Sequence, residues 1–423
     1  MSKWNKISIG EFIDFNPSES IKKGTIARKI PMDKLGTFQR KINGSELSEY
    51  SSGPKFRNGD TLVAKITPCL ENGKTALVDI LNDKEVAFGS SEFIVLRENK
   101  NSDKKFIYYL SRSPLFRNKA ISCMEGTSGR KRVNEGALKT QEILVPDLPT
   151  QQKIASVLSA LDDKIELNNS INEELEAMAK TLYDYWFVQF DFPTHSHCEE
   201  RGTRDEAIHN KKIASLHEVT LAKTGYKSSG GKMVYNETLK REIPEGWEVK
   251  TVGNILDKNK ATNKINAKEY LNMGKIPVID QSTNFICGFT NDESSLITTK
   301  EKPAIVFGDH TRILKLINFD FARGADGTQI LFSKIENMPQ FLLYYSLLKI
   351  DLSNYGYARH FKFLKEQNIL IPKKEIAKEF NDLVKSYYVK IYNNLKQNQE
   401  LSALRDWLLP MLMNGQVKVG MLD

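Results

Sequence analysis

Two long stretches of the chain repeat apolar residues at the spacing of a helix that packs along one face. The first, residues 149–190, has no glycine and no proline after Pro149, and "FDFP" at 190–193 marks its end. Thr150 is the expected N-cap. The positions on the apolar face are Ile154, Leu158, Leu161, Ile165, Asn168, Asn172, Leu175, Ala179 and Leu182. Steps of four and three, a mean period of about 3.5 residues, predict one long helix with a coiled-coil seam.

The second stretch, residues 374–415, follows the same steps at a constant offset of 226 residues. Asn414-Gly415 supplies its stop signal. The same offset relates "LKTQEILVP" at 138–146 to "LKEQNILIP" at 364–372, in which six of nine residues are identical. We infer an internal duplication. The seam positions of this second stretch are Phe380, Val384, Tyr387, Ile391, Asn394, Asn398, Leu401, Arg405 and Leu408.

The duplication predicts how the two seams are buried. Matched apolar stripes most simply pack against each other, and a two-fold relation between the copies makes the pairing antiparallel. Asn168 and Asn172 would then face Asn394 and Asn398, a polar layer that costs stability but fixes the register. The alternative is that each helix packs on its own domain and exposes its asparagines.

The two blocks ahead of these helices, residues 1–148 and 244–373, have a different pattern. Each opens alike, from Trp4 and from Trp247, and contains short β-rich runs such as "EFIVL" and "KPAIVFG" broken by turn residues. Each also has a helical stretch near its end. The fold class is therefore α+β, with two globular domains of mixed α and β structure, a pseudo-two-fold internal repeat, and two long helices that form an antiparallel coiled coil. Residues 191–243 form a connector with turn chemistry.

Composition narrows the function classes. No apolar run approaches the roughly 18 residues of a membrane span, and "MSKWNKISIG" has no secretory h-region. Four scattered cysteines read as reduced thiols, so we expect a cytoplasmic protein with no membrane partner. The net charge is +8, with the basic excess in the two α+β blocks. Such blocks indicate a polyanion partner, or merely a well-solvated basic surface.

Signatures of catalysis are weak. The "HSHC" stretch at 195–198 lies in a polar connector and lacks the second ligand pair of a structural zinc site. Asp162 and Lys164 mimic a metal-dependent nuclease signature, but two residues apart on a helix they point to different faces, which predicts a solvated helix surface. We therefore expect no catalytic residue, no metal ligand and no cofactor in this chain, and a non-catalytic role.

Basic loops that contain glycine recur in both blocks, at 67–74 and 125–133 in the first and at 308–315, 323–329 and 355–362 in the second. The loops at 125–133 and 355–362 stand in similar places, ahead of the repeated "LK.Q". Arg reads guanine and Asn or Gln reads adenine in the major groove, and the remaining Lys and Arg anchor phosphates. Taken singly, each loop fits a solvated turn, but the equivalent location in both halves favours DNA binding. The candidate DNA-binding residues are Lys65, Asn72, Lys74, Arg130, Lys131, Arg132, His310, Arg312, Arg323, Gln329, Arg359, His360 and Lys362.

Large aromatic and apolar residues end both long helices, in "YDYWF" and "RDWLLPML". They either cap the core against a neighbouring domain or form a docking surface for a partner subunit, since exposed Trp and Tyr anchor interfaces. Two such ends would suit two copies of one partner. The candidate partner-binding residues are Tyr185, Trp186, Phe187, Trp407 and Leu408.

The chain resembles the specificity subunits of type I restriction-modification systems. Residues 143–187, from "ILVPDLPTQQKIASVL" to "YDYWF", look like the family's central spacer helix, and "YKSSGGKMVYNETLKREIPEGW" at 226–247 looks like its connector. "PCLENGK" at 68–74 and "GDHTR" at 308–312 recur in its recognition domains. Residues 196–225 are longer than that connector and do not look like it, so we expect an atypical insertion.

The resemblance implies a division of the chain and a set of partners. Target recognition domains would span 1–148 and 244–373, and spacer helices 149–190 and 374–415, with the connector over 191–243. The chain would bind double-stranded DNA and two methyltransferase subunits that carry S-adenosylmethionine. ATP-driven restriction (translocase) subunits would bind ATP and Mg²⁺, so these cofactors belong to partners.

Geometry adds an expectation of its own. The seam from Ile154 to Leu182 spans about 42 Å at 1.5 Å per residue, close to the 34–36 Å of one duplex turn. We therefore expect a split DNA target with an unread gap. Three alternatives stay open: a specificity chain that works only with a methyltransferase or with another nuclease, a pseudo-symmetric protein-binding scaffold, and an enzyme active on its own.

Overall fold

The computed structural model describes residues 4–127, 129–193, 225–257, 263–299, 302–356 and 359–419. It divides into two compact units. Unit 1 comprises Met1–Asn169 and Leu395–Asp423, and unit 2 comprises Ser170–Asn394. The division cuts both long helices, whereas the boundaries predicted from the sequence follow the ends of elements. The segment predicted as an insertion, 196–225, lies outside the described residues except for Gly225, and so does the "HSHC" stretch.

Unit 1 is built on two four-stranded sheets, ordered β2-β9-β6-β7 and β4-β3-β8-β5. The pair β1-β12 joins the start of the unit to its end, and β10-β11 is a short hairpin. Its elements are β1 (Trp4–Ser8), α1 (Ile9–Phe12), β2 (Asp14–Phe15), β3 (Ile26–Ile30), the 3-10 turn Met32–Lys34, β4 (Glu46–Glu49), β5 (Lys55–Phe56), β6 (Thr61–Ala64), β7 (Thr75–Leu77), β8 (Ala87–Gly89), β9 (Phe93–Arg97), α2 (Lys104–Arg112), α3 (Pro114–Ser122), β10 (Met124–Glu125), β11 (Arg132–Val133), α4 (Glu135–Lys139) and β12 (Glu142–Pro146).

Unit 2 repeats this plan. Its four-stranded sheet is ordered β17-β16-β21-β18, and β20-β19-β22 form a three-stranded sheet. Its elements are β13 (Met233–Asn236), β14 (Arg241–Pro244), β15 (Glu248–Thr251), α7 (Val252–Ile255), the 3-10 turns Ala267–Glu269 and Glu293–Ser295, β16 (Ile276–Ile279), β17 (Gly288–Thr290), β18 (Leu296–Ile297), β19 (Ala304–Gly308), β20 (Leu314–Ile317), β21 (Phe321–Arg323), β22 (Thr328–Leu331), α8 (Gln340–Leu348), α9 (His360–Glu366) and β23 (Asn368–Ile371).

The two units share strand order and strand direction. In the sheets β4-β3-β8-β5 and β17-β16-β21-β18 the central pair, β3-β8 or β16-β21, is parallel and the outer pairs are antiparallel. In each unit the first strand pairs antiparallel with the last, β1 with β12 and β15 with β23. This shared plan confirms the internal repeat predicted from the sequence, because it preserves a mixed order of parallel and antiparallel pairs that the nine-residue match alone does not determine.

The continuous apolar runs form strands that are buried on both faces. Along β9, Ile94 and Leu96 join the hydrophobic cluster beneath α2, whereas Phe93 and Val95 join a second cluster between the sheets. Alternate side chains of a strand point to opposite faces, so a strand between two cores is apolar throughout. β19 is divided between two clusters in the same way. "EFIVL" and "KPAIVFG" therefore form inner strands of their sheets, β9 and β19.

The two long helices are α5 (Leu148–Tyr183) and α10 (Lys374–Met413). Asp147, not the predicted Thr150, caps α5, because its Oδ1 accepts the Thr150 N–H at 3.1 Å. A π-helical turn over Asp184–Val188 follows α5. The predicted stop of α10 is confirmed: the helix ends at Met413, and Gly415 takes the left-handed conformation with φ +70°.

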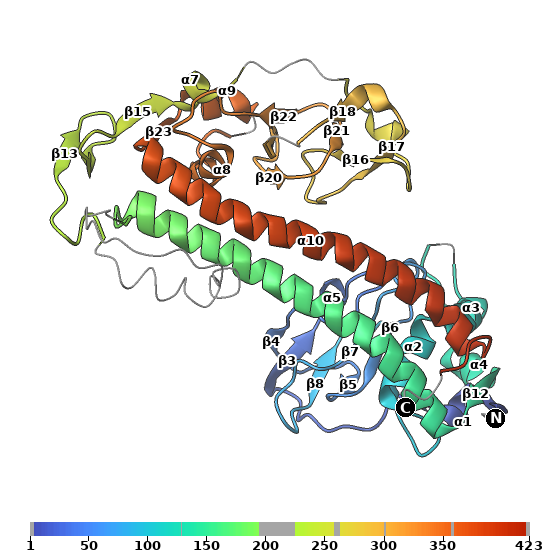
Figure 1. Ribbon diagram of the computed structural model, residues 1–423. Coiled ribbons are helices and arrows are strands. Elements are labelled where there is room, and N and C mark those ends of the chain that lie inside the picture. The colour runs from blue at the N-terminus through green and yellow to red at the C-terminus, as the bar shows by residue number, and fades with distance from the viewer. Residues whose placement is uncertain are drawn as a thin grey trace, which may run out of the picture. The chain divides into compact units, whose positions relative to one another are not determined.

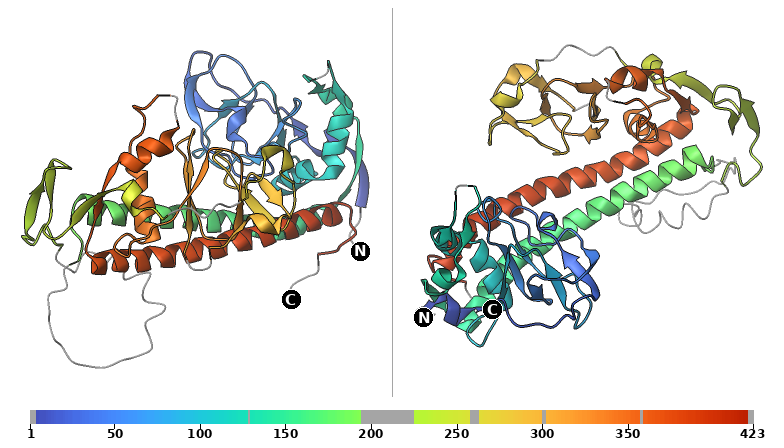
Figure 2. Two further views of the ribbon diagram at one scale, coloured as in Figure 1. Left: turned by 90° about the horizontal axis from the view of Figure 1, so that it is seen from above. Right: turned by 180° about the vertical axis from the view of Figure 1, so that it is seen from behind.

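Within each unit, a half of α5 and a half of α10 lie side by side in opposite directions (Figures 1 and 2). In unit 1, Asn168 Nδ2 donates to Asn398 Oδ1 at 2.9 Å. In unit 2, Asn394 Nδ2 donates to Asn172 Oδ1 at 2.8 Å. Every predicted seam position is buried or half-buried. The antiparallel pairing and its polar layer are therefore confirmed, and the alternative of exposed asparagines is wrong.

Asp162 departs from its prediction as a solvated helix position, because only 3% of its surface is exposed. Its Oδ1 accepts from Arg405 Nη1 at 2.6 Å, and its Oδ2 accepts from the Tyr109 hydroxyl at 2.7 Å. Helices α2, α5 and α10 thus meet at one buried carboxylate inside unit 1. The sequence interpretation was wrong because it considered only the helix that carries Asp162 and not the two helices that cover it.

Candidate nucleic-acid interface

Unit 1 brings its two predicted basic loops together at the carboxyl end of β6. The Thr67 N–H donates to the Lys131 carbonyl at 3.0 Å, and the Val133 N–H donates to the Lys65 carbonyl at 2.9 Å. A bridge also pairs Ile66 with Arg132. The loop after β6 and the hairpin β10-β11, more than 50 residues apart in sequence, therefore form one surface.

The cations of this surface differ in how they are held. Lys65 Nζ lies 3.2 Å from Glu135 Oε1. Arg132 donates to both carboxylate oxygens of Glu92 at 2.7 to 3.0 Å and thereby lowers the pKa of that carboxyl. Arg130 and Lys131 are exposed at the tip of the hairpin. The tip therefore offers two solvated cations, while Lys65 and Arg132 are oriented by carboxylates.

Asn72 and Lys74 lie at the other end of the loop after β6. Asn72 is exposed, whereas Lys74 is half-buried and its Nζ donates to the Met32 carbonyl at 3.0 Å. Arg117 is a cation at this loop that the sequence interpretation missed. Its Nη2 donates to the Glu71 carbonyl at 2.6 Å, and its guanidinium lies 4.9 Å from the Phe38 ring centre. Burial lowers the pKa of Arg117.

In unit 2 three predicted loops converge on Asp309, the first residue after β19. The His360 N–H donates to the Asp309 carbonyl, and the Phe361 N–H donates to its Oδ1, both at 2.8 Å. The Asp309 N–H donates to the Gly327 carbonyl at 2.7 Å. Asp309 therefore caps α9 and joins the loops at 308–312, 323–329 and 355–362, the segments that the sequence analysis grouped by charge.

The cations and amides on these loops also fall into two groups. The His360 ring is buried, and its nitrogens lie 3.0 and 3.1 Å from backbone carbonyls, so this histidine holds the loop together. Arg312 donates to the Leu352 carbonyl at 3.2 Å, and the half-buried Arg323 donates to the Thr328 carbonyl at 2.8 Å. Gln329 is half-buried in β22. The exposed members of the predicted set are His310, Arg312, Arg359 and Lys362.

Two further residues belong to this surface and were missed. Lys264 pairs with Asp326 at 2.8 Å, and Gln281 contacts two of the loops. Both residues lie at least 27 positions from the loops that they contact, outside the segments selected by the sequence analysis. No local pattern in the sequence could have identified them.

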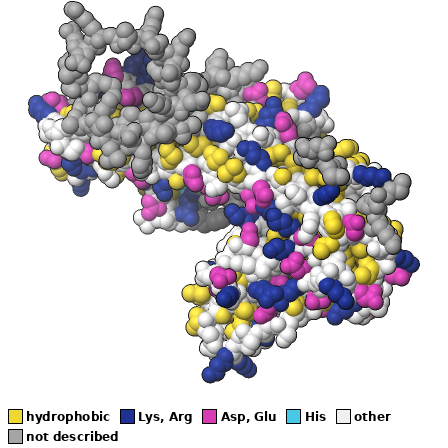
Figure 3. Space-filling model, turned by 60° about the horizontal axis from the view of Figure 1, so that its bottom comes forward, with side chains coloured by type: hydrophobic (Ala, Val, Ile, Leu, Met, Phe, Trp, Pro, Cys, Tyr) yellow, Lys and Arg dark blue, Asp and Glu magenta, His cyan; other side chains and the backbone are white. Residues whose placement is uncertain are grey.

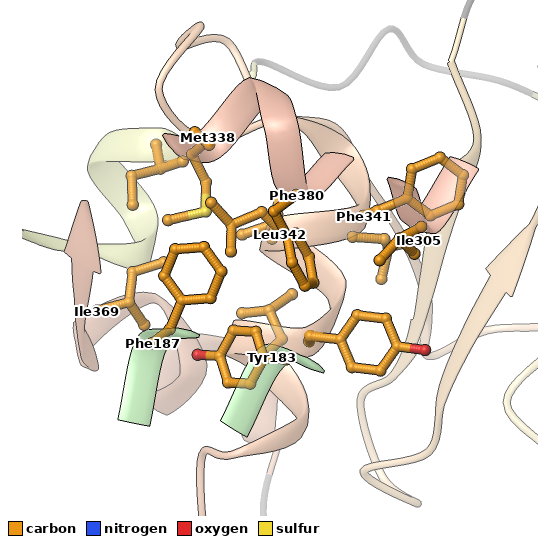
Figure 4. Packing of buried hydrophobic residues seen from close by; sticks show 14 of the residues in the cluster. Tyr183, Phe187, Ile305, Met338, Phe341, Leu342, Ile369 and Phe380 are labelled. Carbon is orange, nitrogen blue, oxygen red and sulfur yellow. The ribbon is translucent and has the colours of Figure 1, made fainter. Parts of the chain in front are cut away.

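The candidate partner-binding residues differ in exposure. Only 2% of Trp186 is exposed, and Phe187 is buried beside it in the core of unit 2, against Phe380 of α10 (Figure 4). These two side chains therefore cap the core, as the alternative interpretation has it. Tyr185 is half-buried at the edge of the same cluster. At the other helix end Trp407 is 56% exposed.

Leu408, the last of the candidate partner-binding residues, is half-buried against the core of unit 1. Trp407 is thus the member of the predicted set whose indole is open to a partner. On the face drawn in Figure 3, acidic and basic side chains are interspersed.

Two other kinds of feature are absent from the described part of the chain. There, no group of three or more His, Cys, Asp or Glu side chains is arranged to hold a metal ion. No helix among the described residues is long and apolar enough to cross a membrane.

Comparisons with known proteins agree with this arrangement. The chain is 26% identical to the HindI specificity subunit of Haemophilus influenzae, over 99% of this chain and all of that one. It is 28% identical to the MjaIX specificity subunit of Methanocaldococcus jannaschii, over 74% of this chain and 69% of that one. The fold is similar to the S subunit of M. genitalium, with a TM-score of 0.56 at 17% identity over 99% and 97% of the two chains.

The match to a family description covers most of both halves of the repeat. Residues 1–177 and 244–403 match the family described as "Type I restriction modification DNA specificity domain". Each matched range contains one α+β block and most of the long helix that follows it. The chain belongs to this family and is a DNA sequence-specificity subunit of the type I restriction-modification class.

Proposed function

We propose that the chain reads a DNA target in two parts, one with residues 1–148 and the other with residues 244–373. One observation carries the proposal: the same strand plan recurs in both units, and in each unit the predicted basic loops meet after the equivalent central strand, β6 or β19. The loops themselves differ in sequence and in contacts. Two similar frames with different loops suit two different half-targets.

The exposed cations suit phosphate contacts that hold the domain in register on the duplex. Arg130 and Lys131 in unit 1, and Arg359 and Lys362 in unit 2, extend into solvent. Most protein–DNA hydrogen bonds go to phosphate and sugar and fix orientation, whereas a few base contacts provide specificity. In this proposal the fixed polar residues behind those cations set the positions of the base-reading groups.

The chain would carry no reaction of its own and would position enzyme subunits. Two methyltransferase subunits with S-adenosylmethionine, and restriction (translocase) subunits with ATP and Mg²⁺, would supply the chemistry. Support comes from the relatives named as specificity subunits of restriction enzymes. The exposed Trp407 is the docking residue that we propose for one of these partners.

The paired helices would set the length of the unread gap. At 1.5 Å per residue, removal of seven residues shortens a helix by about 10 Å, or about three base pairs of duplex at 3.4 Å each. Seven residues are also two turns of a coiled coil, so the seam keeps facing its partner. The asparagine pairing sets residues 165–171 opposite 395–401, which makes these two segments a matched pair for removal.

The experiment maps methylated adenines with this chain and its methyltransferase subunits expressed together, before and after both segments are deleted. We expect both half-targets to persist and the gap to shorten by about three base pairs. Deletion from α5 alone is the control, because it shifts one part of α5 by a heptad relative to α10 and should abolish methylation. A change in the half-targets themselves, with the gap unchanged, would refute the spacer role of the helices.

A further inference from the structure

Gln281 connects two loops of unit 2 that carry candidate DNA contacts. Its Oε1 accepts the His310 backbone N–H at 3.1 Å. Its Nε2 donates to the Asp326 carbonyl at 3.0 Å. A glutamine amide has one acceptor oxygen and one donor nitrogen, and here each end holds a different loop.

The backbone around Gln281 is packed as closely as its side chain. The Thr311 hydroxyl donates to the Gln281 carbonyl at 2.7 Å. A Cβ added to Gly327, where φ is +86°, would lie 2.7 Å from Gln281 Nε2 and 2.9 Å from His310 Cδ2. A Cβ added to Gly308 would lie 2.9 Å from Gln281 Cβ. Both loops therefore approach Gln281 at positions where only glycine leaves enough room.

The segment that carries Gln281 is itself held by hydrogen bonds from Lys315 and Tyr270. The ammonium of the buried Lys315 donates to the carbonyls of Asp280 and Asn284 at 2.8 and 2.5 Å. The Tyr270 hydroxyl donates to Asp280 Oδ2 at 3.2 Å and accepts the Ala325 N–H at 2.9 Å. Gln281 thus projects from a fixed base, and a change in its side chain alters the two loops more directly than the base.

Charged groups surround the two loops that Gln281 joins. His310 is exposed on the first loop, and Arg323 begins the second. The Asp326 carboxylate, paired with Lys264, has its pKa lowered by that lysine and more weakly by Arg359 and Arg323. The uncharged amide of Gln281 therefore joins two loops that carry charged side chains.

We propose that Gln281 is a positioning residue that fixes the loops at 308–312 and 323–329, so that its loss relaxes base discrimination in the half-target read by unit 2. This inference rests on the proposed function, in which residues 244–373 read one half of the target. Base edges are recognised by paired hydrogen bonds that need accurate geometry. Phosphate contacts tolerate displacement, because they depend mainly on charge and distance.

The test compares Gln281→Met and Gln281→Glu with the wild type, each as the full chain assembled with its methyltransferase subunits. Methionine keeps the side-chain length but loses both hydrogen bonds. Glutamate can still accept the His310 N–H but cannot donate to the Asp326 carbonyl. Thr283→Val is the matched control, because Thr283 is exposed two residues further along the same segment.

Three measurements are needed: selection of preferred duplexes from a randomised library, the dependence of DNA affinity on salt, and the thermal melting temperature. For Gln281→Met we expect discrimination at the second half-target to fall at least about fivefold, the lower limit for removal of one paired hydrogen bond to a base. For Gln281→Glu, discrimination at the second half-target should fall less. The first half-target, the salt slope and the melting temperature should match those of the wild type and of Thr283→Val.

Each contrary outcome has a distinct meaning. If Gln281→Met keeps wild-type preferences at both half-targets, the inference fails while the two-part proposal stands. If both half-targets weaken together with a lower melting temperature, Gln281 is only structural and the inference also fails. If the wild-type complex itself selects no two-part target, the proposed function fails and the inference fails with it.

Discussion

The buried Asp162–Arg405 pair gives the most direct test of the packing inside unit 1. Arg405→Met removes the cation that donates to Asp162 Oδ1 at 2.6 Å. The carboxylate, 3% exposed, keeps the Tyr109 hydroxyl at 2.7 Å and the Arg112 guanidinium at 4.0 Å. Removal of one partner from a buried ion pair costs about 3–5 kcal/mol, since the remaining charge stays desolvated. Because Arg112 compensates in part, we expect about 3 kcal/mol.

Hydrogen exchange of the amides of α10 around residue 405, followed by mass spectrometry, reports this destabilisation locally. A decrease of about 3 kcal/mol in the opening free energy should accelerate exchange by about 100-fold. Lys396→Met, at an exposed position of the same helix, is the matched control and should change exchange little.

A triple variant separates desolvation from packing. Asp162→Leu, Arg405→Met and Tyr109→Phe together remove the ion pair and the hydroxyl that donates to it, while Arg112 keeps the Tyr108 hydroxyl and Asp406 as partners. Replacement of a buried ion pair by apolar side chains of similar size is often neutral or stabilising. We expect the triple variant to lie within about 1 kcal/mol of the wild type. If Arg405→Met alone changed exchange less than about fivefold, equivalent to about 1 kcal/mol, the pair would not be desolvated as described.

Three further predictions concern DNA, partners and the seam. Arg130→Ala with Lys131→Ala should weaken DNA binding and reduce the salt slope by about one for each phosphate that is no longer neutralised, and an unchanged slope would place these cations away from DNA. Trp407→Ala should weaken association with the methyltransferase while the melting temperature holds, whereas Trp186→Ala should cost about 3–5 kcal/mol of stability in chemical denaturation. Asn394→Leu should destabilise unit 2 by about 1–3 kcal/mol, because its amide partner stays buried without a hydrogen bond, and a stabilised variant would contradict this.

Local pattern in the sequence was enough for much of the framework. The seam positions, the polar layer and the central strands are all set by residues whose spacing matches a helical or extended period. The repeat then required both helices to find equivalent environments, which explains why their antiparallel pairing could be predicted. The cap of α5 lies at Asp147 instead, because the helix already begins at Leu148 and the Asp147 carboxylate accepts the Thr150 N–H.

Residues joined across long sequence separations could not be predicted in this way. The pattern of the helix that carries Asp162 predicts an exposed side chain. The groups that bury it, Tyr109 and Arg405, lie 53 and 243 residues away in the sequence. His360 was grouped with the basic loops by charge, yet its ring bonds to the Asp309 carbonyl, 51 residues earlier. In both cases the deciding interaction depends on the tertiary fold and leaves no periodic trace.

The two copies of the domain show which contacts the fold requires in both units and which side chains differ between them. The residue after the central strand is Lys65 in unit 1 and Asp309 in unit 2. The Lys65 carbonyl accepts the N–H of Val133, just before α4, and the Asp309 carbonyl accepts the N–H of His360, at the start of α9. The backbone link is thus shared, while the side chain changes from a cation paired with Glu135 to an anion that caps α9. The backbone hydrogen bond does not depend on the identity of the side chain, so the side chains at this surface can differ between the two copies. Two copies of one domain can therefore acquire different DNA preferences without loss of the common fold.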